Sequence, residues 1–501
     1  MNLDRRAFLP GAVSGAAVLA LSACVGPPSP APSPTGTVKP TSVPGVPRAS
    51  GFVRSAWSTD PFSRGATSFL PVGAAPELRE ALRQSVSDRV FFAGEATSSD
   101  FPGTLHGAQS SGQRAATELI AAASDGERIA IIGAGMAGAA AAKALTAAGF
   151  EVLVFEGRER LGGRVDARTG DKWPLVVDLG PSYLRGVESS TLSEQLHDAD
   201  VTTEPIDSDS RIERTASGAS VSPDASIGRD TVDAAIAWGA AGSRDVSLTD
   251  ALAGAGGAAT DGSTDELGVS PAARVAAYVD RTITTQRGAP TGELSTWYGL
   301  SDGDEPEGGD VFIAGSAEAI VKAGFEGAEV VLSTPVTQIG YDDDAVRLKM
   351  ATGESLRVDR VVVTVPLGVL QSESIAFDPP LPFAQRAAIT ALGVGALEKV
   401  WLRYDEPFWQ DDAVLWSIVA ETPPYTAAPT TPGLETPTPS PSDGSELRIT
   451  EWVNLLPLTG DAVLMGIIGG EAARELSALG DDEVRTIAEQ SLMAFLPTTT
   501  S

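Results

Sequence analysis

The sequence predicts an α/β fold, because two short apolar runs lie on either side of a glycine-rich turn and an alanine-rich segment. Residues 129–132 form the first run, which is typical of a buried parallel strand. The turn has the spacing G-x-G-x-x-G, and a predicted helix then runs to Ala148. Residues 151–155 form a second strand that ends at Glu156. This order predicts a Rossmann-type dinucleotide-binding unit rather than a glycine turn without function.

Each glycine of the turn has its own expected role. Gly133 permits the tight turn, Gly135 lets the backbone approach a pyrophosphate, and Gly138 lets the helix pack against the strand. The helix N-terminus faces the anion, and the Glu156 carboxylate would accept hydrogen bonds from a ribose. The expected cofactor contacts here are Gly133, Gly135, Met136, Ala137, Gly138 and Glu156.

Residues 156–164 distinguish a flavin site from a nicotinamide site. They read E-x-x-x-R-x-G-G-R, which resembles the FAD signature of the flavin amine oxidase superfamily. Two glycines let the chain pass close to the diphosphate, and Arg164 offers it a planar charged fork. The alternative is a basic solvated turn. The resemblance implies contacts from Arg158, Gly163 and Arg164, and a glutathione-reductase-like FAD-binding domain beside an α+β substrate domain of the amine oxidase type.

Residues 1–24 are interpreted as a targeting signal. Residues 4–9, D-R-R-A-F-L, resemble a twin-arginine export signal, and residues 21–24, L-S-A-C, resemble a bacterial lipobox. We therefore expect an exported cell-surface lipoprotein, anchored to the membrane only through a lipid on Cys24; a plain signal-peptide cysteine is the alternative. Cys24 is the only cysteine. Disulfides and a cysteinyl flavin bond are thus excluded, and FAD is expected to be non-covalent.

The order of the segments that follow is unusual. Residues 25–50 are rich in Pro, Ser and Thr and are predicted to be a disordered tether. Residues 53–73 and 89–119 resemble the last segments of flavin amine oxidases, yet they precede the nucleotide motif. A circular permutation explains this, with residues 123–127 as the new linker. A second oxidase fused in front would predict another copy of these motifs after Leu496, and the sequence has none.

The permuted order gives a predicted domain map. It assigns residues 51–88 to a relocated substrate-domain segment, 89–186 to the FAD-binding domain, 187–308 to a helical substrate domain, 309–370 to the return of the FAD-binding domain, and 371–501 to the substrate domain with a disordered loop at 422–446.

The relocated residues 90–123 resemble a second FAD-binding segment. A strand at 90–93 ends at Gly94 and Glu95, and a helix rich in small residues begins near Thr104. Its N-terminus would stabilise negative charge on a reduced flavin, although a packing helix is the plain alternative. His106 is expected to be structural, and two histidines in the chain argue against a histidine metal cluster, so no metal is predicted. The implied contacts are Gly94, Glu95, Thr104, Leu105 and Ala108.

Two later segments complete the implied cofactor site. Residues 178–186 resemble the family's D-x-G-x-x-W-x-x-G loop along the flavin, with Tyr183 in place of tryptophan. The strand at 335–339 resembles the one whose valine contacts the adenine, which implies Val336. The remaining implied contacts are Gly180, Pro181, Ser182 and Tyr183.

Lys399 is the candidate catalytic residue. Strand alternation places it on the same face as Leu397 and Trp401, among apolar groups. In the family the matching lysine holds a water against flavin N5; an exposed strand lysine is the alternative. Thr67 and Thr104 stand where monoamine oxidases carry two aromatic residues, so an aromatic cage would need Trp57, Phe69 or Trp401. The expected substrate pocket comprises Thr67, Thr104, Arg185 and Trp401.

The resemblance implies an FAD-dependent oxidase of primary or secondary amines, in which hydride passes from the amine to flavin N5 and O2 reoxidises the flavin to give H2O2. Alternatives are a flavin oxidoreductase acting on an L-amino acid or a polyene, and a non-catalytic FAD-containing lipoprotein. The net charge of −30 disfavours a nucleic-acid partner. It would attract cationic amines, although solubility explains an acidic surface equally well.

Overall fold

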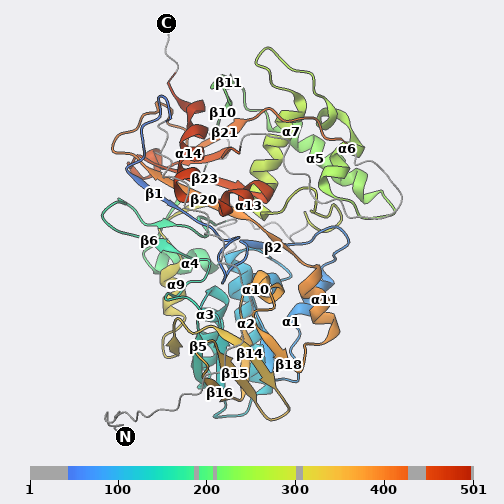
Figure 1. Cartoon of the computed structure of the whole chain (residues 1–501), viewed down its shortest axis with the longest axis vertical. Helices are drawn as coiled ribbons and strands as arrows, with labels where there is room; N and C mark the ends of the chain where they lie inside the picture. The colour runs from blue at the N-terminus through green and yellow to red at the C-terminus, as the bar shows by residue number, and fades with distance from the viewer. Residues whose placement is uncertain (1–42, 185–190, 207–210, 301–308, 427–446, 498–501) are drawn as a thin grey trace, which may run out of the picture. The chain divides into compact units, whose positions relative to one another are not determined.

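A five-stranded parallel sheet carries the predicted nucleotide motif. Its strand order is β13 (Glu329–Val331), β5 (Glu151–Phe155), β4 (Arg128–Ile132), β17 (Arg360–Val363) and β3 (Val90–Phe92). The computed structural model describes residues 43–184, 191–206, 211–300, 309–426 and 447–497, all in the unit that begins at Ser42 (Figure 1). The predictions for the signal, for Cys24 and for Arg185 therefore fall outside the described residues.

The parallel sheet is covered on both faces, as its apolar strands require. Ile129 and Ile131 of β4 pack with the helices α2 (Leu105–Ala122) and α3 (Met136–Ala147). Ala130 and Ile132 face the other way, towards a four-stranded sheet. That sheet has the order β16 (Ser355–Val358), β15 (Val346–Met350), β14 (Val336–Tyr341) and β18 (Ala376–Asp378). The two strands and the helix predicted within residues 129–155 are confirmed, and their predicted ends agree with the observed ends to within one residue.

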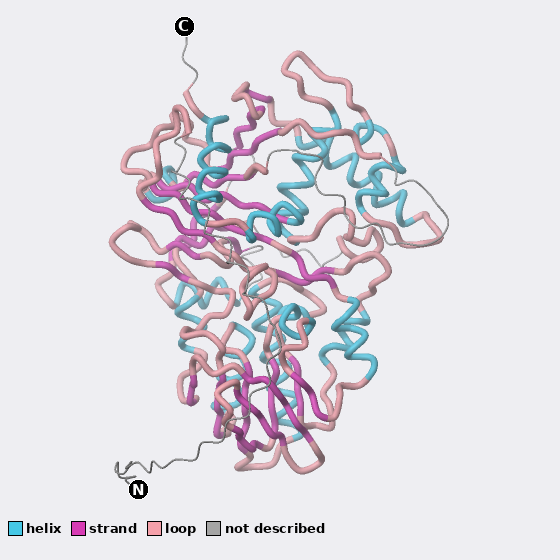
Figure 2. Tube along the Cα trace, viewed as in Figure 1, coloured by secondary structure: helices cyan, strands magenta, loops and turns pink. Residues whose placement is uncertain are grey.

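A seven-stranded sheet forms the other wall of the site. Its order is β1 (Gly51–Arg54), β20 (Leu397–Arg403), β23 (Val463–Gly469), β22 (Glu451–Asn454), β21 (Leu415–Val419), β10 (Arg211–Thr215) and β11 (Ser220–Val221). Only the β10–β21 pair is parallel. The helices α13 (Gly470–Ala478) and α14 (Asp481–Ser491) pack into the core on one face of the sheet. Figure 2 shows the strands gathered into two main groups, one for each half of the described unit.

A group of helices packs beside the seven-stranded sheet. It consists of α5 (Ala225–Ala240), α6 (Leu248–Ala255) and α7 (Pro271–Val279), which continues as a π-turn, η4 (Asp280–Thr284), and as α8 (Thr285–Arg287). Ser247 caps the N-terminus of α6, because its Oγ accepts from Asp250 N at 3.1 Å. Pro271 begins α7, where its missing N–H costs nothing.

The remaining elements are short. They are β2 (Thr67–Phe69), α1 (Glu77–Arg83), η1 (Glu95–Thr97), β6 (Ala167–Arg168), β7 (Val177–Asp178), β8 (Tyr183–Leu184), α4 (Thr191–Asp198), β9 (Thr202–Pro205), η3 (Gly257–Thr260), β12 (Val311–Ala314), α9 (Glu318–Ala323), α10 (Leu367–Gln371), α11 (Phe383–Ala391), β19 (Gly393–Gly395), α12 (Leu456–Thr459) and η5 (Leu492–Phe495). No helix in the described ranges is long and apolar enough to cross a membrane.

The domain map needs three corrections. The segment 187–308 is not only helical, because β10 and β11 extend the seven-stranded sheet. The nucleotide-binding half continues past residue 370, since β18 pairs with β14. Helix α1 also packs there, against α11, although it comes from the segment 51–88. Short strands with polar alternation, such as β10, give a weak signal in a sequence and are fixed by their neighbours.

The N-terminal segments are joined to strands far along the chain. Strand β1 pairs with β20, β2 pairs with β19, and β3 pairs with β17. Residues 43–50 are also ordered, contrary to the predicted tether, because Val43, Val46 and Ala49 are buried and Ala49 N donates to Glu489 Oε1 at 3.1 Å. These contacts bring the start of the described unit beside its last helix, as a permuted order would require. The permutation itself stays a prediction.

Candidate functional site

A cavity of about 1840 Å³ is lined by both halves of the described unit. The lining includes the glycine turn after β4 and the face of the seven-stranded sheet that carries Lys399. Most of the residues expected at the cofactor lie on its wall. They are Gly94, Glu95, Thr104, Leu105, Ala108, Gly133, Gly135, Met136, Ala137, Glu156, Arg158, Gly163, Arg164, Gly180, Pro181, Ser182, Tyr183 and Val336. Thr67 and His106 line it as well.

Two of the expected site residues that the structure describes do not line this cavity. A Cβ on Gly138 would meet Gly133 O at 2.2 Å, so this glycine serves the close packing of α3 on the turn. Trp401 was expected in the substrate pocket, and this is corrected: it is 1% exposed and its Nε1 donates to Asp178 O at 3.2 Å. The indole lies behind the loop that follows β7, against Phe312, because alternation fixes the face of a residue but not which groups cover it.

The glycine turn forms an open cradle at the N-terminus of α3. Gly133 has a φ of 109°, a conformation that favours glycine. Gly162 N donates to Ala134 O at 2.9 Å, which brings Gly162 and Gly163 beside this turn. A Cβ on Gly135 would find no atom closer than 3.7 Å, so space is left on the cavity side. The Glu156 carboxylate accepts from Ala134 N and from Arg158 N, both at 2.8 Å. These features fit the pyrophosphate and ribose of FAD.

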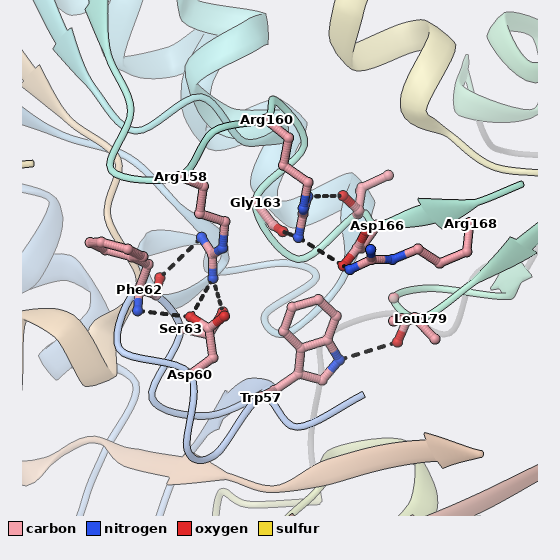
Figure 3. Close-up of polar contacts among 12 residues, drawn as sticks. Trp57, Asp60, Phe62, Ser63, Arg158, Arg160, Gly163, Asp166, Arg168 and Leu179 are labelled. Atoms are coloured by element: carbon pink, nitrogen blue, oxygen red, sulfur yellow. Dashed lines mark hydrogen bonds and ion pairs between the residues drawn. The ribbon is translucent and has the colours of Figure 1, made fainter. Parts of the chain in front are cut away.

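The arginines after β5 hold the cradle in place (Figure 3). Arg158 Nη2 donates to Asp60 Oδ1 at 2.6 Å and to Ser63 Oγ at 2.7 Å. Arg160 Nη2 donates to Gly163 O at 2.9 Å and lies 3.0 Å from Asp166 Oδ2. The side chain of Arg158 thus connects the loop after β5 to residues 60–63, and the side chain of Arg160 holds Gly163 in position.

Glu95 connects three separate segments at the edge of the cavity. Its carboxylate accepts from Ser68 Oγ at 2.6 Å, from Gly103 N at 2.9 Å and from Arg164 Nη1 at 3.1 Å. Burial on its own would raise the pKa of Glu95, but Arg164, Ser68 and Arg79 together hold it below its usual value. The carboxylate is therefore ionised at neutral pH. It orients the Arg164 fork that was expected to meet the diphosphate.

Thr104 begins the helix that follows Glu95. Its Oγ1 accepts from Gly107 N at 3.0 Å and caps α2. His106 lies in the first turn of this helix, with its ring centroid 6.0 Å from that of Phe101, and burial lowers the pKa of the imidazole. The small residues of α2 meet α3 closely, since a Cβ on Gly112 would lie 2.2 Å from Ala137 O. Helix α2 therefore packs closely against α3 and also has its N-terminus at the cavity.

Lys399 is buried on the cavity wall. Its Nζ donates to Gly180 O and, at 2.6 Å, to Ser182 Oγ, so the ammonium lies against the loop expected along the flavin. Burial lowers the pKa of Lys399 to about 8, and the Asp178 carboxylate acts in the opposite direction. Asp178 is held by Gly180 N at 2.7 Å, and burial raises its own pKa. An exposed strand lysine, the alternative reading, is excluded by an exposed fraction of 4%.

Four charged residues of the cavity wall were not expected from the sequence. Arg211 Nη1 donates to Glu451 Oε2 at 2.7 Å, and Arg281 Nη1 donates to Glu213 Oε1 at 2.7 Å. All four line the cavity. Their sequence signal is the alternation of Arg211 and Glu213 in β10, which is visible only once that segment is known to be a strand.

Aromatic side chains also line this end of the cavity. Trp57 and Phe69, two of the three rings considered above, are on the wall, and Trp57 Nε1 donates to Leu179 O at 3.1 Å. Tyr183 and Tyr278 line it too. Rings are therefore present although Thr67 and Thr104 occupy the two expected positions.

Family models match most of the chain. The model described as flavin containing amine oxidoreductase matches residues 37–120 and 286–500, and a model of the NAD(P)-binding Rossmann-like domain matches residues 131–199. Polyamine oxidase 4 of Oryza sativa subsp. japonica is 26% identical over 74% of this chain and 73% of that protein. Lysine-specific histone demethylase 1 homolog 2 of Arabidopsis thaliana is 30% identical over 56% of this chain, which spans 38% of that protein.

A solved structure of putrescine oxidase, wild type bound to putrescine, shares the fold. The TM-score is 0.52 at 20% identity, and the match covers 74% of this chain and 82% of that one. The cradle fits FAD, and the family model and the relatives give the chemistry. The chain belongs to the flavin-containing amine oxidoreductases and is an FAD-dependent enzyme of amine oxidation.

Proposed function

We propose that the chain is an oxidase of primary or secondary amines that uses O2 as electron acceptor. The observation that carries the proposal is Lys399, which is buried on the cavity wall between the nucleotide cradle and the apolar face of the seven-stranded sheet. The cradle after β4 would hold FAD, which would supply the two-electron oxidation of the bond between the amine nitrogen and its neighbouring carbon, with O2 as acceptor and H2O2 as product. The named relatives, a polyamine oxidase and a putrescine oxidase, favour the same chemistry.

The residues of the chain supply position and a dry surface. Leu397, Leu415, Val453 and Ile467 line the cavity beside Lys399, and such apolar walls favour the neutral form of an amine, the form that can lose hydride. An ammonium has three donors, and Lys399 uses two of them on Gly180 O and Ser182 Oγ. The third donor is available to hold a water in the cavity, in agreement with the role that the resemblance implies.

An L-amino acid substrate is less well supported. It would need a cation for its carboxylate, and Arg185 lies outside the described residues. Arg211 and Arg281 line the cavity, but each is already paired with a glutamate, at 2.7 Å in both cases. A substrate carboxylate would have to compete with Glu451 and Glu213 for these two arginines.

The test uses protein that lacks residues 1–24. Its flavin spectrum is recorded, and a panel of mono-, di- and polyamines is then added without oxygen. We expect an amine to bleach the flavin, H2O2 to form when air is admitted, and bleaching to be about 100-fold slower or more in Lys399→Met, in line with the usual size of a positioned proton-handling group. Lys143→Met, at an exposed position of α3, is the matched control. A bound flavin that no amine reduces would refute the proposal.

A further inference from the structure

Three successive carbonyl groups at residues 178–180 each accept a hydrogen bond from a side chain that is distant in the sequence. The pairs are Asp178 O with Trp401 Nε1 at 3.2 Å, Leu179 O with Trp57 Nε1 at 3.1 Å, and Gly180 O with Lys399 Nζ. Trp401 and Lys399 belong to β20, whereas Trp57 belongs to the segment that follows β1 (Figure 3). Buried carbonyl groups need such donors, so the path of this loop depends on how firmly Trp57 is held.

Glu398 holds the segment that carries Trp57 against β20. Its side chain points away from that of Lys399, because neighbouring residues of a strand face opposite sides, and it is fully buried and does not line the cavity. Its Oε2 accepts from Ser55 Oγ at 2.5 Å, and its Oε1 accepts from Ser58 N at 3.1 Å. Burial raises the pKa of Glu398, and the hydrogen bonds from residues 55, 57 and 58 act in the opposite direction.

Ser55 connects this carboxylate to the backbone of Lys399. Its Oγ accepts from Lys399 N at 2.8 Å, and its own N donates to Lys399 O at 3.0 Å. The contacts therefore form a closed circuit, which runs from Glu398 through residues 55–58 to the loop at 178–180 and back to the Lys399 ammonium. In a buried circuit of this kind, loss of one member leaves its partners without a hydrogen bond.

We propose that Glu398 is a positioning residue for Lys399. It holds residues 55–58 against β20, and Trp57 Nε1 of this segment then fixes Leu179 O. The loop held in this way keeps the Lys399 ammonium in one orientation at the cavity. This inference rests on the part that Lys399 has in the proposed function.

The first experiment measures amide hydrogen exchange of residues 177–184 in FAD-loaded protein that lacks residues 1–24. Glu398→Leu removes both acceptors, and Trp57→Phe removes only the Nε1 donor. Each should speed exchange of this loop by about fivefold, the size expected for one lost hydrogen bond. Leu402→Ala is the matched control, because it shortens a fully buried side chain on the same face of β20 as Glu398, and it should change this exchange by less than about twofold.

Unchanged exchange of the loop in either Glu398→Leu or Trp57→Phe would overturn the assignment. Trp57→Phe leaves the contacts of Glu398 in place, so it tests the link to the loop even if Glu398→Leu does not fold.

A double-mutant cycle separates positioning from a general structural role. Glu398→Leu should slow anaerobic reduction of the flavin by an amine about 10-fold or more, since a small misplacement of a reacting group has an effect of this size. When Lys399 is already methionine, the same change should slow reduction by less than about twofold. Glu398→Gln keeps an acceptor for Ser58 N and should restore the rate to within about threefold of the wild type.

Equal factors in the two backgrounds, or no rescue by Glu398→Gln, would overturn the assignment of Glu398 while amine oxidation itself stands. Failure of every amine to reduce the wild-type flavin would overturn the proposed function, and hydrogen exchange would still decide whether Glu398 fixes the loop.

Discussion

Replacement of Lys399 by methionine should change how the stability of the protein depends on pH. Burial lowers the pKa of Lys399 from 10.5 to about 8, partly offset by the Asp178 carboxylate. In the unfolded chain a lysine titrates near 10.4, and one pKa unit corresponds to about 1.4 kcal/mol, so the shift amounts to about 3 kcal/mol. Methionine is similar in length and carries no proton, so Lys399→Met removes this contribution.

The sign follows from proton binding. Between about pH 8 and pH 10.4 the unfolded wild type keeps the lysine proton while the folded wild type has lost it, so raising the pH stabilises the fold. Below pH 8 both states are protonated, and the folded state carries the full cost of the buried charge. The free energy of unfolding of the wild type should therefore rise by about 3 kcal/mol relative to Lys399→Met across this window.

The assay is urea unfolding of FAD-loaded protein lacking residues 1–24, at a series of pH values from neutral upwards. Loss of the hydrogen bonds to Gly180 and Ser182 changes the free energy of unfolding of Lys399→Met by an amount that does not depend on pH. The informative quantity is therefore how the difference in free energy of unfolding between wild type and Lys399→Met changes with pH. Lys143→Met, at an exposed position, should run parallel to the wild type. A difference between wild type and Lys399→Met that stays constant within about 1 kcal/mol would show that Lys399 is not a buried cation.

Two further predictions concern the cofactor cradle. Gly135→Ala should have a melting temperature close to that of the wild type, because its added methyl would lie no closer than 3.7 Å to any protein atom. The variant should still bind FAD weakly, because the methyl would occupy the space of the cradle in which the diphosphate is expected. Gly138→Ala should lower the melting temperature, since its methyl would lie 2.2 Å from Gly133 O. Equal melting temperatures for the two variants would contradict this. Glu95→Gln should release FAD more readily at neutral pH, which the fluorescence of released FAD measures. The free energy of unfolding of the wild type should fall as the pH falls through the lowered pKa of Glu95, because the stabilisation from an acid with a depressed pKa is present above its unfolded value and is lost as the pH falls through its folded value. A difference in the free energy of unfolding between wild type and Glu95→Gln that does not change in acid would argue against this role of the carboxylate.

Much of the nucleotide-binding half was predictable from the sequence because its signals are local. The glycine spacing after β4 sets a turn within six residues, and the continuous burial of residues 129–132, whose side chains point alternately to the two faces, follows from a parallel sheet that is covered on both faces. The caps at Thr104 and Ser247 act over three residues. Such patterns involve neighbours in the chain, so no tertiary information is needed to read them.

The substrate end was not predictable in the same way. Lys399 was identified by its flanking residues, but the position of Trp401 behind the Asp178 loop depends on which segment covers its strand. Arg211 and Glu451 are 240 residues apart and meet only because β10, β21 and β22 are neighbours in register.

The sequence by itself determined the cofactor and the family resemblance and singled out Lys399 as the candidate catalytic residue, because each is encoded in a short motif whose geometry is local. The tertiary structure alone decided that one cavity joins the cradle to the sheet, and that Lys399 of β20 and Glu451 of β22 both line it. The physical reason is register: strands with weak individual signals are aligned by their neighbours, and a shift of one residue would turn every one of these side chains to the opposite face.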